Sequence, residues 1–159
     1  MDPLFEFALS VKALQRELER GSNELMKPLG LTGPQADALF VIGQAQPIAL
    51  KDLGRLLIAE AGHPSRLVDR LVEAGLVERR GAQGDRRRVE LKLTPAGQRL
   101  ARRVDKARQE LFDAGRAHVD EKRLVAATAV FRQLLEGTPA GELIERRRRL
   151  AAGRPVTYE

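Results

Sequence analysis

The sequence predicts a mainly α protein with a small β wing near its middle, that is, an α+β fold. Apolar residues recur every three or four positions over most of the chain, which is the spacing of helices with one buried face. Residues 76–93 instead contain two short stretches typical of strands around a glycine-rich turn. The 159 residues are 43% hydrophobic and 31% charged, so the chain is long enough for one domain with a core.

The N-terminal part, residues 3–29, is predicted to be one long helix. Its apolar residues follow one another at spacings of three, four and seven, as in a helix that packs against other helices. These residues are Leu4, Phe7, Val11, Leu14, Leu18 and Leu25. Such a stripe is more typical of a dimer core than of a binding groove.

The next helix start is marked by residues 32–35, Thr-Gly-Pro-Gln, which form a capping box with proline in the first turn. This helix is predicted to end before Gln46 and Pro47. Residues 48–50 are predicted to be a very short extended segment, and residues 50–61 a further helix. The inward side chains of that helix would be Leu53, Leu56 and Leu57.

A second helix is predicted to begin at Pro64, with His63 as its N-cap, and to stop at Gly75. One face of this helix is apolar and the other is polar. The apolar face holds Leu67, Val68, Leu71 and Val72, and the polar face holds Ser65, Arg66, Asp69, Arg70 and Glu73. Arginines on a helix face can serve solubility alone, so this face by itself does not identify a binding site.

A two-stranded ribbon is predicted directly after this helix. Residues 76–80 would form its first strand, and apolar and charged residues alternate in the second strand up to Leu93. The turn at residues 81–85 is rich in glycine, and three arginines follow it at 86–88. A solvated turn is the ordinary explanation of such a run, but adjacent arginines repel one another unless an anion meets them.

Two long helices are predicted after the ribbon. Thr94 and Pro95 form the start of the first, which extends to about His118 and carries a heptad stripe. Asp120 is a plausible cap for the second. Its inward residues would be Leu124, Ala127, Phe131 and Leu134.

The C-terminal segment, residues 137–159, is predicted to be a basic helix and tail. The sequence Gly-Thr-Pro at 137–139 breaks the preceding helix, and residues 140–152 form one further short helix. Four arginines occupy positions 146–149. We predict that they form a solvated face, with an added phosphate contact as the alternative.

A helix followed by a ribbon with a basic tip is the layout of a winged helix-turn-helix. Four blocks occur in order: Ser65–Leu71, Gly75–Arg79, Asp85–Arg87 and Leu93–Gly97. Together they resemble the MarR (multiple antibiotic resistance regulator) family. The resemblance is sharp over residues 32–97 and extends to the flanking helices as a pattern only.

The resemblance implies a division of the chain into four parts. Residues 1–31 would be an N-terminal dimerisation helix, and residues 32–97 a winged helix-turn-helix lobe that binds DNA. Residues 98–136 would be C-terminal dimerisation helices, and residues 137–159 a basic helix and tail. The chain would then act as a homodimer that binds a pseudo-palindromic operator, as a ligand-responsive repressor.

The resemblance also implies which residues contact double-stranded DNA. Ser65, Arg66 and Arg70 would do so from the helix, and Arg86 and Arg87 from the wing. Asp85 would pair with a nearby arginine and orient the wing. Weaker or additional candidates are Lys51, Pro64 and Arg88.

The family resemblance further implies a small aromatic or phenolic ligand that changes the spacing of the two lobes. The expected site is the cleft between the 3–29 helix, the 35–45 helix and the first half of the 95–118 helix. Its walls would include Leu14, Leu18, Phe40 and Leu100, with an arginine near the mouth to hold an anion. A reversible ligand is also what remains by elimination, because a thiol switch and a zinc sensor are disfavoured.

The composition excludes several classes of function. The absence of cysteine excludes a disulfide framework, a thiolate nucleophile and thiol redox sensing. His63 and His118 are too few for an ordinary zinc site, so neither a metal nor a cofactor is expected. No pair of carboxylates or glycine-rich phosphate loop argues for catalysis. Without a long apolar run or a signal peptide, we expect a cytoplasmic protein with no membrane contact.

The charge balance favours a nucleic-acid partner. The net charge is +6 and the isoelectric point is about 10.3, which favours an anionic partner. Aromatic residues make up 4% of the chain and are not interleaved with basic ones, which disfavours single-strand binding by stacking. Two alternatives stay open: a winged-helix module that binds only protein, and a small enzyme whose site the sequence does not reveal.

Overall fold

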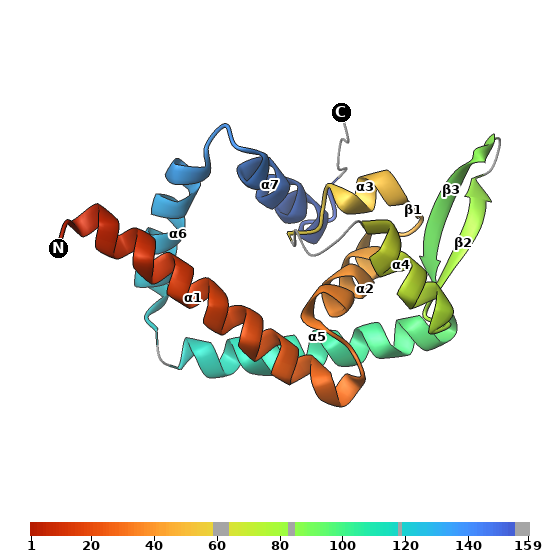
Figure 1. Cartoon of the computed structure of the whole chain (residues 1–159), viewed down its shortest axis with the longest axis horizontal. Helices are drawn as coiled ribbons and strands as arrows, with labels where there is room; N and C mark the ends of the chain where they lie inside the picture. The colour runs from red at the N-terminus through yellow and green to blue at the C-terminus, as the bar shows by residue number, and fades with distance from the viewer. Residues whose placement is uncertain (59–63, 83–84, 118, 155–159) are drawn as a thin grey trace.

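The computed structural model describes residues 1–58, 64–82, 85–117 and 119–154, and the side chains of residues 82 and 85–88 lie outside this description. A lobe that contains a small sheet lies at one end of the molecule, and long helices extend from it to the other end (Figure 1). The predicted α+β class, mainly helical with a β wing, is confirmed.

Helix α1 (Pro3–Met26) forms as predicted and continues into the short 3-10 helix η1 (Lys27–Leu29). Helix α2 (Gly33–Ala45) then begins at the predicted capping box. The amide of Gln35 donates to Thr32 Oγ1, and the amide of Thr32 donates to Gln35 Oε1 at 2.9 Å. Two of the backbone donors left free at a helix start are satisfied in this way.

The lobe continues with β1 (Ile48–Ala49), α3 (Leu50–Gly54), α4 (Pro64–Glu73), β2 (Val77–Ala82) and β3 (Asp85–Leu93). The three strands form an antiparallel sheet in the order β1-β3-β2. The predicted extended segment at 48–50 is therefore a third strand, in which Ile48 lies opposite Leu91. The sheet ties the start of the helix-turn-helix to the wing.

Helix α3 is shorter than the predicted helix at 50–61, of which residues 59–61 lie outside the described residues. After Gly54 the chain tightens into a turn. The amide of Leu56 donates to the carbonyl of Leu53, three residues back, at 2.9 Å. Glycine has a low helix propensity, which favours an early end here. The predicted inward side chains Leu53, Leu56 and Leu57 are all buried.

Three helices complete the chain: α5 (Pro95–Arg116), α6 (Glu121–Leu135) and α7 (Pro139–Ala151). Each begins at a side-chain cap, supplied by Thr94, Asp120 and Thr138. Their order and approximate bounds are those predicted from the sequence. Helix α5 passes under the lobe, α6 rises at the far end, and α7 turns back toward α2 and α3 (Figure 1).

The hydrophobic core lies in the lobe. It is built from fully buried side chains of the lobe elements and is extended by one side chain each from α1 and α5. Its largest members include Met26, Leu39, Ile42, Leu53, Leu71, Leu91 and Val104. No residue of α6 or α7 is buried, although all the residues of these two helices are described. The lobe thus shares one core with the end of α1 and the first half of α5, whereas α6 and α7 contribute no buried residue to it.

Large apolar side chains remain exposed on α1, α5 and α6. They include Leu4, Phe5, Leu14, Leu18, Leu111, Phe112, Leu124, Val125 and Leu134. The rings of Phe7 and Phe131, 5.7 Å apart between centroids, join α1 to α6 at this end. A single chain therefore offers too little apolar surface to cover the predicted apolar stripes of these helices. Among the described helices, none is both long and apolar enough to cross a membrane.

Candidate nucleic-acid interface

Helices α3 and α4 meet at a glycine. A Cβ atom added to Gly54 would lie 3.2 Å from Cγ of Pro64, so the absence of a side chain lets the two helices approach closely. Helix α4 begins at Pro64, as predicted, while its expected N-cap, His63, lies outside the described residues. Lys51 is exposed on α3, on the surface of the lobe.

Helix α4 presents one face to the core and the other to solvent. Val68 and Leu71 are buried, whereas Arg66 and Arg70 are exposed and Ser65 is half-buried. Because apolar contacts fix the helix from below, its arginines are free to meet a partner without any cost to the core. The structure thus brings Ser65, Arg66 and Arg70 together at the surface.

The C-terminal end of α4 is closed by the predicted glycine. Gly75 has φ = 68°, a left-handed conformation that glycine adopts without strain. The amide of Gly75 donates to the carbonyl of Val72 at 2.9 Å. The amide of Leu76 donates to the carbonyl of Leu71, also at 2.9 Å. This pair of bonds is a Schellman motif. It turns the chain directly from the helix into β2.

An ion pair joins α4 to the wing. Arg79 Nη2 of β2 lies 2.5 Å from Asp69 Oδ1 of α4. Both side chains are partly exposed, so the pair contributes modestly to stability, but it fixes how the ribbon leaves the helix. The sequence analysis placed Asp69 on the polar face without a partner. The available signal was the short spacing of ten residues across a helix-to-strand turn.

The root of the wing is locked to the start of α5. Thr94 Oγ1 donates to the carbonyl of Gly75 at 2.7 Å and accepts the amide of Gly97 at 3.0 Å. A Cβ added to Gly97 would lie 1.9 Å from the carbonyl oxygen of Leu76, so this position has no room for a side chain. The Leu-Thr-Pro-Ala-Gly block therefore holds α4, the wing and α5 in one fixed arrangement.

The wing strands are longer than predicted. The pairing of β2 and β3 continues to Ala82 and Asp85, with an irregularity at Gly81 and Ala82. Strand β3 therefore begins at Asp85 and includes Arg86 and Arg87, which were predicted to lie between the turn and the second strand. Backbone pairing does not require alternating apolar side chains, which is why the polar pattern concealed the strand ends.

Four side chains at the tip of the wing lie outside the described part of the structure. They are those of Asp85, Arg86, Arg87 and Arg88. The expected DNA contacts of the three arginines and the expected role of Asp85 in orienting the wing stay predictions. The ribbon that carries them projects away from the lobe (Figure 1).

The four residues expected to line a ligand cleft differ in their exposure to solvent. Leu14 and Leu18 are exposed, while Leu100 packs against the core of the lobe. Phe40 is half-buried, and the guanidinium carbon of Arg108 lies 4.8 Å from the centre of its ring. Their role in binding a ligand stays a prediction.

An ionic cluster lies beside Phe40. Asp37 Oδ1 of α2 accepts from Arg147 Nη2 of α7 at 2.5 Å and from Arg108 Nη2 of α5 at 3.3 Å. All three side chains are about one-fifth exposed, at 20–21%. One carboxylate therefore connects three helices that are far apart in the sequence.

The prediction that positions 146–149 form a solvated face is wrong for Arg147. Leu143, Ile144 and Leu150 share with Arg147 the side of α7 that is half-buried, at helical spacings of three and four. The periodicity of these three apolar residues was the signal that could have identified the inward arginine. Arg148 instead pairs with Glu145 along the helix, at 2.8 Å.

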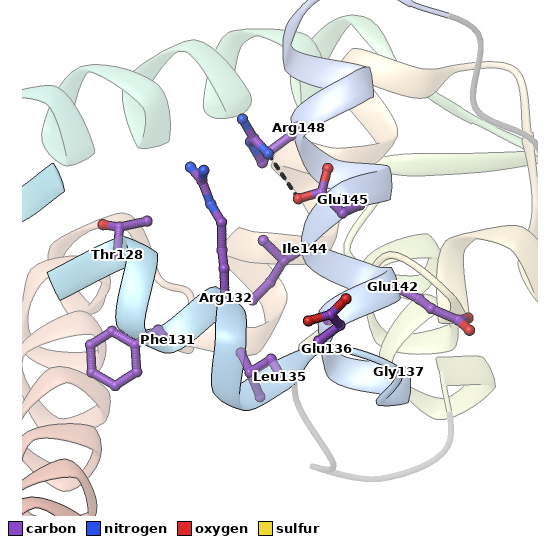
Figure 2. A pocket seen from close by; sticks show the side chains of 11 residues that line it. Thr128, Phe131, Arg132, Leu135, Glu136, Gly137, Glu142, Ile144, Glu145 and Arg148 are labelled. Carbon is purple, nitrogen blue, oxygen red and sulfur yellow. Dashed lines mark hydrogen bonds and ion pairs between the residues drawn. The ribbon is translucent and has the colours of Figure 1, made fainter. Parts of the chain in front are cut away.

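A pocket of about 670 Å³ lies between α6 and α7. Phe131, Leu135 and Ile144 supply its apolar lining, and Arg132 and Arg148 are among the charged residues around it (Figure 2). None of the four predicted ligand residues belongs to it. Within the described part of the chain, no three His, Cys, Asp or Glu side chains lie close enough together to hold a metal ion. His63 and His118 lie outside that part.

Comparison with known proteins shows which proteins this chain resembles. Residues 31–97 match the family model of the winged helix DNA-binding domain. The chain is 34% identical over 87 residues to the multiple antibiotic resistance protein MarR of Escherichia coli, covering 55% of this chain and 60% of that protein. It is 28% identical over 85 residues to the organic hydroperoxide resistance transcriptional regulator of Bacillus subtilis, covering 54% and 58%. The matched segment thus spans somewhat over half the length of these curated relatives.

Solved structures extend the likeness beyond the lobe. A mutant E. coli MarR complexed with operator DNA superposes with a TM-score of 0.74 at 25% identity, covering 83% of this chain and 95% of that chain. The Staphylococcus aureus MepR–DNA complex shares the fold, with a TM-score of 0.72 at 18% identity and coverage of 81% and 95%. In its winged-helix domain and in its fold, the chain is therefore similar to winged-helix transcriptional regulators of the MarR family.

Proposed function

We propose that this protein is a sequence-specific transcriptional regulator that binds double-stranded DNA as a homodimer. The observation that carries the proposal is helix α4, whose buried Val68 and Leu71 leave Arg66 and Arg70 exposed beside a projecting ribbon. Operator DNA is bound by a MarR variant of similar structure. Because the matched relatives are transcription regulators, an enzymatic role has no comparable support.

Helix α4 would enter the major groove, because an exposed helix of this width fits there and can read base edges. Arg66, in the first turn, is placed to make a bidentate contact with a guanine. Arg70, one turn later, would reach a base or a phosphate. The wing arginines at 86–88 would meet the backbone or an adjacent minor groove.

The dimer would form through the exposed apolar surface of α1, α5 and α6. A second copy could cover Leu4, Leu14, Leu111 and Leu124, all of which are exposed in the single chain. The two α4 helices would then lie about 34 Å apart, one turn of DNA, and the operator would be a pseudo-palindrome. In this proposal, residues 1–31 and 98–136 form the dimer and residues 32–97 bind DNA.

We further propose that the protein acts in the cytoplasm as a repressor that a small aromatic or phenolic anion releases. Arg108, whose guanidinium carbon lies 4.8 Å from the centre of the Phe40 ring, would hold the anion at the expected cleft. To relieve repression, the ligand must bind the DNA-incompetent arrangement of the lobes more tightly, by about 1–3 kcal/mol. DNA must then weaken ligand binding by the same factor.

The decisive experiment begins by selecting bound fragments from genomic DNA. Affinities for a selected and a scrambled duplex would then be compared for wild type, Arg66→Ala and Arg123→Ala. Arg66→Ala should reduce the free energy of binding to the selected duplex by about 1–3 kcal/mol, and that to the scrambled duplex by less. Arg123 is exposed on α6, far from α4, and its replacement removes the same charge without either effect. Equal weakening of both duplexes by Arg66→Ala would mean that Arg66 contacts only phosphate.

A further inference from the structure

Helix α7 leaves α6 through a corner whose geometry is fixed by close contacts. Gly137 has φ = 71°, and Thr138 Oγ1 donates to the carbonyl of Leu135 at 2.7 Å. The same oxygen accepts the amide of Gly141 at 3.1 Å. A Cβ at Gly141 would lie 2.2 Å from the carbonyl oxygen of Leu135. The corner therefore sets the direction in which α7 leaves, back toward the lobe (Figure 1).

Between this corner and the lobe, α7 is only loosely packed. No residue of the helix is fully buried, and a pocket of about 670 Å³ separates part of it from α6 (Figure 2). At the lobe, Leu150 packs against the hydrophobic core and Arg147 reaches Asp37. The ion pair of Arg147 therefore adds a polar attachment to the apolar contact of Leu150.

The ion pair is part of a cluster with an unbalanced charge. Two arginines, Arg108 and Arg147, share the single carboxylate of Asp37, and Arg108 also stacks on Phe40. The Nη1 atom of Arg147 is buried and has no hydrogen-bond partner in the described part of the chain. Loss of Asp37 would leave two half-buried arginines without a partner, whereas release of Arg147 to solvent would leave the balanced pair of Asp37 and Arg108.

We propose that α7 is an intramolecular strap that holds the winged-helix lobe in one orientation relative to α5 and α6. Arg147, Asp37 and Arg108 form its clasp. The effect on DNA rests on the proposed function: two half-sites are reached together only when each lobe is held at the right separation. A closed strap limits the motion of the lobe before binding, so opening of the clasp weakens binding to the operator.

The test compares Arg147→Met with Arg149→Met in the full-length protein. Both substitutions remove one positive charge from α7 and keep an apolar stem, but Arg149 is exposed and lies outside the cluster. Hydrogen exchange of residues 139–151 should become faster in Arg147→Met and stay unchanged in Arg149→Met. The Kd for the selected duplex should rise about fivefold or more in Arg147→Met only.

A double variant tests whether the two partners act as one unit. The Kd of the double variant Arg147→Met and Asp37→Asn for the selected duplex should be no higher than the higher Kd of the two single variants. Sedimentation should show the same oligomeric state throughout, so that loss of the strap is not confused with loss of the dimer.

Two results would overturn the strap. Unchanged exchange of α7 in Arg147→Met would mean that the clasp does not hold the helix. Faster exchange with unchanged DNA affinity would mean that α7 does not control the lobe. If the wild type binds no duplex at all, the proposed function fails, and the exchange comparison alone still decides whether Arg147 holds α7 to the lobe.

Discussion

Replacing Gly97 by alanine tests whether the wing and α5 are locked together by backbone contact. The added Cβ would lie 1.9 Å from the carbonyl oxygen of Leu76, which also accepts the amide of Thr94 at 3.0 Å. Helix propensity alone favours alanine by up to about 1 kcal/mol. Overpacking costs about 1–3 kcal/mol, and an obstacle made of backbone belongs in the upper part of this range. We therefore expect a net loss of about 1–2 kcal/mol in the free energy of unfolding.

Chemical denaturation followed by circular dichroism, at one fixed protein concentration, measures this change. Gly115→Ala is the matched control, because Gly115 lies in the same helix and a Cβ there meets nothing within 4 Å. The control should be stabilised by up to about 1 kcal/mol, so the two substitutions should have opposite signs. A Gly97→Ala variant as stable as wild type would refute the proposed locking of the wing root.

Further predictions concern the wing, the core and the dimer. Arg79→Met should weaken DNA binding but lower stability by less than about 1 kcal/mol, because its pair with Asp69 is exposed; titration and denaturation measure the two effects. Asp85→Ala should weaken binding although it removes a negative charge, and tighter binding in the same titration would exclude its role in orienting the wing. Leu71→Ala, at a fully buried position, should cost about 2–5 kcal/mol in a denaturation experiment. Deletion of residues 1–18 should give monomeric or insoluble protein, and a folded dimer in sedimentation would contradict the proposed interface.

Helix starts and stops could be predicted because they depend on neighbouring residues. The side chains of Thr32 and Thr94 each accept an amide three residues further on, and the fixed φ of Pro64 suits the first turn of α4. Gly75 marked the end of α4 for the same local reason. The order of helices and strands therefore followed from the sequence pattern.

Contacts between distant segments could not be predicted in this way. Asp37 and Arg147 are 110 residues apart, and nothing near either one marks the other as its partner. Arg147 also stands in a run of four arginines, so composition alone does not show which of them pairs with Asp37. The extent of the wing strands was missed because paired backbone does not need the apolar alternation that the sequence analysis relied on.

The candidate site was predictable in part. The exposed position of Arg66 and Arg70 followed from helical periodicity, whereas their assignment to DNA rested on the family resemblance. The tie between Asp69 and Arg79 and the close approach at Gly97 became apparent only from the folded arrangement.

The most direct test of the account is a hydroxyl-radical footprint of the protein on a duplex selected from genomic DNA. A homodimer with one α4 helix in each of two successive major grooves should protect two half-sites about 10–10.5 base pairs apart, centre to centre, on one face of the duplex. The protected sequence should be pseudo-palindromic. A single protected half-site, or no protection beyond that of a scrambled duplex at the same salt concentration, would contradict the account.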